Sequence, residues 1–309
     1  MLTGCEADTS IAPFPNEGEE PVEVRLHATT VGVGVEVTRA GYVPTALTNG
    51  TEIGMFGGIL QNLKLVYNNN ANPNLSTEKQ GKIYYPLQTD SINIYAYAPY
   101  NPQVYNEEDS ILVRSEWHEG TEWANYITDP IWANDTVFRR EAVDGVIDAS
   151  LRFKHTMSKL QIFLVDTTNV TYTEHRVILT FDCPQYGKMS LKTGNIRADE
   201  ATEERYEYGD SYSGYYNLNP YDTNNPYYEH TIMPQSKLKH IFVSFKKAND
   251  DYIYQYNYPE KDSGQDFTIM EFAPGKINRI VIDFGKIKAP QVNGSLENFM
   301  FENEDEIYI

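Results

Sequence analysis

The sequence has little cysteine and no long apolar run. Its two cysteines are Cys5, in a polar N-terminal arm, and Cys183, which precedes a proline in strand-like sequence. A disulfide between residues in such different settings is not expected. No stretch approaches the roughly 20 consecutive apolar residues of a membrane-spanning helix. We therefore expect nothing in the mature chain to cross a bilayer.

Positive charge is also scarce. Lysine and arginine number 25 against 44 acidic residues, which gives a formal net charge of −19. Such a surface repels nucleic-acid phosphates and anionic lipid head groups. The composition therefore argues against nucleic-acid binding and is typical of a soluble, solvated exterior.

Catalytic and metal-binding patterns are missing as well. The six histidines are scattered and form no HExxH pair, and the chain contains no GxSxG, Walker or GxGxxG motif. The Asp222–Asn225 run could bind calcium but lacks EF-hand spacing, so a polar turn is the preferred interpretation. His155, among apolar neighbours, is interpreted as a hydrogen-bonded core or turn histidine. We expect no enzymatic activity, no cofactor and no metal.

Alternation of apolar and polar residues is the dominant pattern. Val22 to Ala28 alternate as a half-buried strand does, and a second set, Val31 to Val37, follows in shifted phase. Only Ile59–Asn68 suggests a short helix. Further strands are expected at Ile53–Phe56, Ser91–Ala98, Ile111–Val113, Val146–Phe153, Lys159–Val165, Arg176–Phe181, Gly187–Leu191, Lys239–Phe245, Tyr252–Tyr256, Phe267–Glu271 and Lys276–Phe284.

Polar, turn-rich runs such as Asn68–Ser76 separate these strands. Many short strands with such punctuation indicate an all-β fold of antiparallel sandwiches rather than a parallel sheet. Because one sandwich would be crowded at this length, we expect two in tandem. The predicted division is a tether over 1–21, an N-terminal domain over 22–146 and a C-terminal domain over 147–309.

The N-terminal Leu2–Cys5 reads LTGC and is followed by a polar stretch rich in Pro, Glu and Gly. An aliphatic residue, a small residue, Gly and then Cys is the pattern of a lipoprotein signal. We interpret Cys5 as the lipidated residue, with a chance tetrapeptide as the alternative. Two acyl chains anchor a protein stably, so the membrane would be contacted only through this lipid.

Several segments, in this order, carry a family resemblance. They are VEVTRAGYVPTALTNGTEIGMFG, INIYAYAPY, ITDPIWAND, LRFKHTMSKLQIFLV, HTIMPQ and FAPGKINRIVIDF. Together they resemble the fimbrillin (Mfa-like) family of lipoprotein pilins from Bacteroidales. The resemblance implies two transthyretin-like sandwiches, export to the outer membrane surface and assembly into a fimbria with other pilin subunits.

In stalk members of that family, a protease cuts after an arginine, the first strand is lost and a neighbour's strand fills the groove. The resemblance implies Arg39, in VTRAG, as the processing site. Arg25 is the second candidate, although it sits inside a strand. The alternative is that Thr38–Ala40 merely ends a strand, because tip or anchor members need not be cut.

The C-terminal FMFENEDEIYI offers candidate donor-strand residues. Phe299 and Phe301 alternate, as do Ile307 and Ile309, and acidic residues separate the two pairs. This segment either fills a neighbour's groove or folds back as an intramolecular hairpin or edge strand.

A different function remains open at this point. Eight tyrosines fall in the stretch Tyr206–Glu229, interpreted as a polar loop. Aromatic faces on an exposed loop would suit sugar rings, so the rival to a fimbrial subunit is a surface glycan-binding lipoprotein. The alternative is that these tyrosines pack onto the sandwich. A host or bacterial surface ligand is a further possible partner.

Overall fold

The computed structural model has an all-β architecture. It describes residues 21–30, 47–79, 81–86, 89–115, 127–184, 186–199, 203–217, 228–249, 253–258, 268–287 and 306–308. Within these ranges the only helical element with assigned bounds is the short 3₁₀ turn η2, Arg139–Glu141. No helix in the described part of the chain is long and apolar enough to span a membrane.

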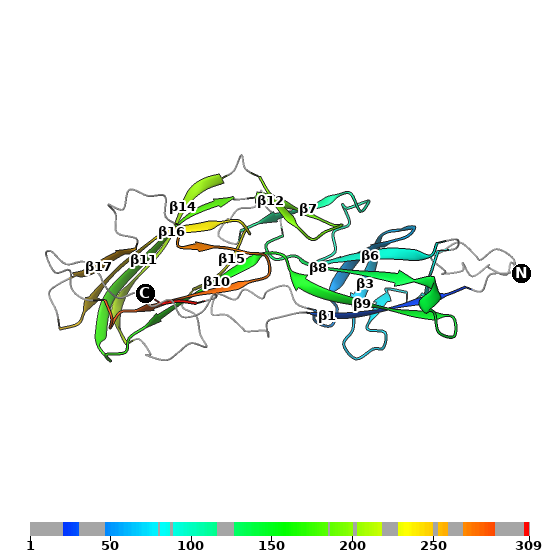
Figure 1. The fold of residues 1–309 in the computed structure, drawn as a ribbon. Coiled ribbons are helices and arrows are strands. Elements are labelled where there is room, and N and C mark those ends of the chain that lie inside the picture. Colours follow the sequence, from blue (N-terminus) through cyan, green and yellow to red (C-terminus); the bar gives the residue numbers. More distant parts are fainter. Residues whose placement is uncertain are drawn as a thin grey trace, which may run out of the picture.

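The first sheet occupies the N-terminal end of an elongated molecule (Figure 1). Its strand order is β4-β3-β2-β6-β8-β9-β1-β5, and β1 also pairs with β4. This extra pairing closes seven strands into a ring, with β5 beside it. The strands are β1 (Glu23–Thr30), β2 (Glu52–Gly57), β3 (Leu60–Tyr67), β4 (Leu75–Thr77), β5 (Ile83–Tyr84), β6 (Ser91–Ala98), β8 (Ile131–Phe138) and β9 (Val146–His155).

Two further sheets form the opposite end of the molecule (Figure 1). One has the order β15-β10-β19-β20, and the other has the order β14-β11-β16-β17 with β18 paired to β16. Their strands are β10 (Ser158–Val165), β11 (Thr171–Pro184), β14 (Glu203–Asn217), β15 (Tyr228–Ile232), β16 (Lys237–Lys247), β17 (Ile253–Tyr258), β18 (Met270–Glu271), β19 (Ile277–Asp283) and β20 (Glu306–Tyr308).

A small three-stranded sheet combines early and late parts of the chain. It contains β7 (Ser110–Arg114), β12 (Tyr186–Ser190) and β13 (Ile196–Ala198), with β12 in the middle. Nearby, the indole Nε1 of Trp132 on β8 donates a 2.7 Å hydrogen bond to the carbonyl oxygen of Leu191. Segments on both sides of position 146, the predicted domain boundary, are therefore joined by this sheet and by the hydrogen bond from Trp132 to Leu191.

Two large clusters of buried apolar side chains match this arrangement. One cluster lies inside the first sheet, between Val22 and Phe153. The other combines the β10–β19 region with Phe56, Tyr97, Val113 and Trp132 from the first half. The side chain of Cys183 is buried in this second cluster.

Strand β9 shows why alternation was a good predictor. Ile147, Ala149, Leu151 and Phe153 are buried, whereas the residues between them are exposed. Because successive side chains point to opposite faces of a strand, this pattern places one face on the core. β9 pairs with β1 and β8 and so belongs to the first sheet. The chain passes from the first sheet to the next at Thr156–Met157, between β9 and β10. The predicted division at 146/147 stays a prediction.

Two predictions about local structure were wrong. Residues 60–67, within the suggested helix, form β3, which pairs with β2 and β4. Residues 203–217, which include the first part of the supposed tyrosine-rich loop, form the long strand β14. β14 pairs with β11 along its length, with Tyr206 in register with Phe181 and Tyr208 with Leu179. Long-range pairing here overrides the turn-forming Gly and Ser residues.

Candidate functional site

β1 is the strand that completes the first sheet. It runs parallel to β9 over its whole length, from Glu23 opposite Val146 to Thr30 opposite Phe153. Its other edge pairs with two short strands: Val24 with Ile83 of β5, and Leu26 with Leu75 of β4. Removing β1 would therefore unpair β9 along a full edge and open the ring.

One face of β1 is part of the core. Val24, Leu26 and Ala28 are 4%, 1% and 1% exposed. Burial of a Val or Leu side chain contributes about 1.5–3 kcal/mol. The space that β1 fills is thus an apolar groove with positions for alternate side chains, flanked by main-chain donors and acceptors. This is the geometry used when an extended segment adds to a sheet.

Ion pairs line the outer face of β1. The Lys82 Nζ lies 2.8 Å from a carboxylate oxygen of Glu23, and the Nε2 of His27 lies 2.9 Å from Asp148 of β9. The hydrogen bond from Lys82 lowers the pKa of Glu23, and Glu23 in turn raises the pKa of Lys82. Because these side chains are partly or largely exposed, they stabilise the strand less than its buried face does.

Most of the predicted site residues lie outside the described residues. This holds for Cys5, Arg39, Phe299, Phe301 and Ile309, and also for Asp222–Asn225. The lipidation, processing and donor-strand roles therefore stay predictions. Arg25, the second processing candidate, lies in the middle of β1 with its side chain 45% exposed.

Ile307 belongs to β20. This short strand pairs parallel to β19, with Ile280 opposite Ile307 and Val281 opposite Tyr308. In this chain residues 306–308 thus lie on the edge of their own sheet, which is the arrangement of the intramolecular alternative.

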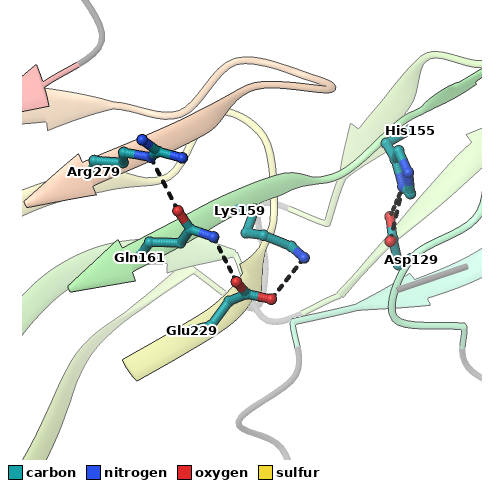
Figure 2. A network of polar contacts seen from close by, with 6 residues as sticks. All are labelled: Asp129, His155, Lys159, Gln161, Glu229 and Arg279. Carbon is teal, nitrogen blue, oxygen red and sulfur yellow. Dashed lines mark hydrogen bonds and ion pairs between the residues drawn. The ribbon is translucent and has the colours of Figure 1, made fainter. Parts of the chain in front are cut away.

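A polar network lies on the sheet of β15, β10 and β19 (Figure 2). The carboxylate of Glu229, whose side chain is 3% exposed, accepts hydrogen bonds from Lys159 at 2.7 Å and Gln161 at 2.6 Å. Arg279 donates to the Oε1 of Gln161 at 3.2 Å. The buried carboxylate is therefore paired, and the network is structural. Sequence reasoning missed it because Glu229 fell in the supposed loop.

His155 is held by a carboxylate. His155 is the last residue of β9, and its Nδ1 lies 2.9 Å from a carboxylate oxygen of Asp129 (Figure 2). Asp129 is 3% exposed. This contact fits the predicted hydrogen-bonded histidine. Among the residues that the structure describes, no three His, Cys, Asp or Glu side chains gather to hold a metal ion.

The chain is similar to solved structures of proteins from Bacteroides and Porphyromonas species. A presumed cell adhesion protein from Bacteroides uniformis has 13% identity and a TM-score of 0.47, covering 88% of this chain and 95% of its own. A fimbrial protein from Bacteroides vulgatus has 13% identity and a TM-score of 0.42, covering 86% and 96%. The fimbrial anchor protein Mfa2 from Porphyromonas gingivalis has 10% identity and a TM-score of 0.32, covering 84% and 90%.

Comparison by sequence identifies the family. Among curated protein sequences, none matches the chain significantly. The family described as fimbrillin-like, in contrast, matches residues 38–298, most of the chain. Members of this family are structural fimbrial proteins of the cell surface rather than enzymes. The chain belongs to the fimbrillin-like family.

Proposed function

We propose that this protein is a structural or tip subunit of a surface fimbria that assembles by strand exchange after losing β1. The observation that carries the proposal is the position of β1, paired on both edges and buried on one face. An unpaired β9 edge beside an apolar groove is a template for another extended segment. The described part of the candidate donor segment, β20, lies beside β19, whereas the groove lies beside β9 in another sheet. Contacts between two different surfaces join successive copies into an open fibre.

Processing after Arg39 would release β1 together with the preceding arm. Arg39 follows Thr30, the last residue of β1, in the segment that leads to β2. Arg25 is a poorer substrate because it lies within a paired strand, whereas a protease needs an extended, accessible segment. Export as a lipoprotein anchored through Cys5 completes the proposal, since the lipid would hold the precursor at the outer membrane until the cut.

The proposal also includes two tandem transthyretin-like domains, predicted as 22–146 and 147–309, with the boundary moved to Thr156–Met157 because β9 (Val146–His155) belongs to the first sheet. The two large buried clusters support a two-part organisation. β7 from the first part of the chain pairs with β12 from the second, so the two parts share a sheet in addition to their covalent connection. The glycan-binding alternative is not proposed, because residues 203–217 form a paired strand rather than a loop.

Limited proteolysis tests the proposal. The folded full-length protein, its Arg39→Ala variant and its Arg25→Ala variant are treated with trypsin, and each product is analysed by N-terminal sequencing and SDS electrophoresis. We expect the wild type and Arg25→Ala to begin at Ala40 and to form SDS-resistant ladders, whereas Arg39→Ala remains unassembled. Ladders formed equally by Arg39→Ala, or an intact wild type, would overturn the proposal.

The donor strand is tested by deletion of residues 299–309. If this segment fills a neighbour's groove, the truncated protein is still cut after Arg39 but forms no ladder. If it serves only as an edge strand beside β19, the truncation chiefly lowers the stability of the monomer and leaves the ladder.

A further inference from the structure

The second edge of β1 lacks a strand partner at Ala28. β4 begins at Leu75, and the antiparallel pair of Leu26 with Leu75 is its only register pair with β1. Continuing that register by two residues on each strand would bring residue 73 opposite Ala28. Residue 73 is proline, which has no N–H to donate. Backbone pairing in this register would therefore give the N–H of Ala28 an acceptor but leave its carbonyl oxygen without a donor.

The side chain of Asn74 satisfies both groups. The N–H of Ala28 donates to the Oδ1 of Asn74 at 2.7 Å, and the Nδ2 of Asn74 donates to the carbonyl oxygen of Ala28 at 2.9 Å. A carboxamide presents one acceptor and one donor side by side, as a strand residue does. Both contacts are made to the main chain, so they do not depend on which side chain occupies position 28.

The loop before β4 is built to hold this amide. The N–H of Asn68 donates to the carbonyl oxygen of Asn74 at 2.8 Å, and the N–H of Ala71 donates to the carbonyl oxygen of Asn68 at 3.1 Å. The N–H of Asn69 donates to the Oδ1 of Asn49 at 2.8 Å. These bonds close the loop on itself and on the preceding turn. Asn74 is therefore held in position by its backbone while its side chain contacts β1.

Space at position 28 is limited. The Ala28 side chain is 1% exposed, and its register partner on β9, Leu151, is fully buried. A larger side chain would displace packed neighbours, which is costly in a well-packed core. The site therefore combines main-chain recognition with room for a small side chain.

We propose that Asn74 is a positioning residue that fixes the register of whichever strand occupies the β1 groove. It does so by binding the main chain at position 28, and it selects against proline and against bulky residues there. The partner is the extended main chain of a neighbouring subunit, so the inference rests on the proposed strand exchange.

Peptide exchange tests the inference on the full chain. After limited trypsin treatment and inhibition of the protease, a fluorescent peptide of residues 22–30 is allowed to replace β1, and its release rate is measured. We expect release to be about tenfold faster from the Asn74→Ala variant, the size of effect expected for the loss of one or two hydrogen bonds. Asn70→Ala, a change of the same residue type at an exposed position of the same loop, should release the peptide at the wild-type rate.

A second peptide separates positioning from general stability. In it the nitrogen of Ala28 is methylated, which removes the N–H that Asn74 binds. Wild-type protein should release this peptide about tenfold faster than the unmodified one. Asn74→Ala should then add less than its full effect on the unmodified peptide, because only the bond from Nδ2 to the carbonyl oxygen of Ala28 remains to be lost. If the two changes multiply in full, or if Asn74→Ala releases the unmodified peptide at the wild-type rate, the inference is overturned.

A readout on the uncleaved chain keeps this inference separate from the proposed function. Failure of any peptide to replace β1 would count against strand exchange. The amide hydrogen exchange of Ala28 still decides the role of Asn74 in that case. Faster exchange at Ala28 in Asn74→Ala, with Val24 unchanged, supports the clamp, and equal exchange at Ala28 overturns it.

Discussion

Leu26 of β1 is paired with Leu75 of β4, and this contact closes the seven-stranded ring of the first sheet. Both side chains are buried, at 1% and 3% exposed. If β1 is removed during assembly, it should stabilise the uncleaved precursor, and the Leu26–Leu75 pair is one contact through which it does so. The ring is closed by the same segment whose loss would open it.

Truncation of Leu26 should therefore destabilise the precursor. We expect Leu26→Ala to lower the free energy of unfolding by about 2–5 kcal/mol, because a buried leucine is replaced by a cavity. Urea denaturation followed by tryptophan fluorescence measures the change. Arg25→Ala, on the exposed face of the same strand, is the control and should stay within about 0.5 kcal/mol. Equal effects of the two variants would show that the buried face of β1 does not hold the ring.

The buried carboxylate of Glu229 should depend on its partner. Lys159→Ala leaves Glu229 with one donor fewer in a site only 3% exposed, and breaking a buried ion pair costs about 3–5 kcal/mol. Lys64→Ala removes a cation that bridges the exposed Glu52 and Glu78, and should change stability little. Thermal unfolding of both variants provides the comparison. A Lys159→Ala variant as stable as Lys64→Ala would contradict the structural role of the network.

Strands β1, β6 and β9 could be predicted from the sequence because each alternates between core and solvent. β6 was even predicted with its observed bounds, Ser91–Ala98. β3 was missed because Leu60, Leu63 and Val66 follow a spacing close to that of a helix, and its strand form depends on pairing with β2 and β4. β8 was missed because a polar Asn-Asp-Thr segment interrupts its apolar residues.

The candidate site was predictable only in part. The alternation of Val24, Leu26 and Ala28 indicated a strand, and the family resemblance implied that it is the exchanged one. The contact of Asn74 with Ala28 joins residues 46 positions apart in an otherwise ordinary polar run. No local pattern marks such a contact, because it exists only once the sheet has brought the loop beside the strand. The parallel pairing of β1 with β9 also joins residues far apart in the sequence, so no local pattern predicts it.

Acid should weaken the fold through His230. Burial lowers the pKa of this imidazole from its ordinary value of 6.5 to about 4, with Glu229 acting in the opposite direction. Since the unfolded chain binds the proton more tightly, stability is lost as the pH falls from 6.5 towards 4. Between pH 7 and pH 5 the wild type should lose about 2 kcal/mol through this group. Urea denaturation at both pH values measures the loss, and His230→Gln should lose correspondingly less. An identical pH dependence in the variant would contradict the assignment.

The hydrogen bond between Trp132 of β8 and Leu191, which follows β12, should stabilise the packing between the first sheet and the rest of the molecule. Trp132→Phe keeps the aromatic packing but leaves the carbonyl oxygen of Leu191 without its buried donor. We expect a loss of about 1–3 kcal/mol in the free energy of unfolding. A Trp132→Phe variant with wild-type stability in urea would show that this hydrogen bond contributes nothing to the free energy of unfolding.

The mass of the assembled subunit tests the central claim most directly. Fibres or SDS-resistant ladders formed after proteolysis are purified, dissociated by prolonged heating and analysed by intact-mass spectrometry. The account predicts subunits that begin at Ala40 and have lost β1, with no separate fragment carrying residues 23–30 in the fibre. Assembled subunits that retain residues 23–30, as part of the chain or as a bound fragment, would contradict it.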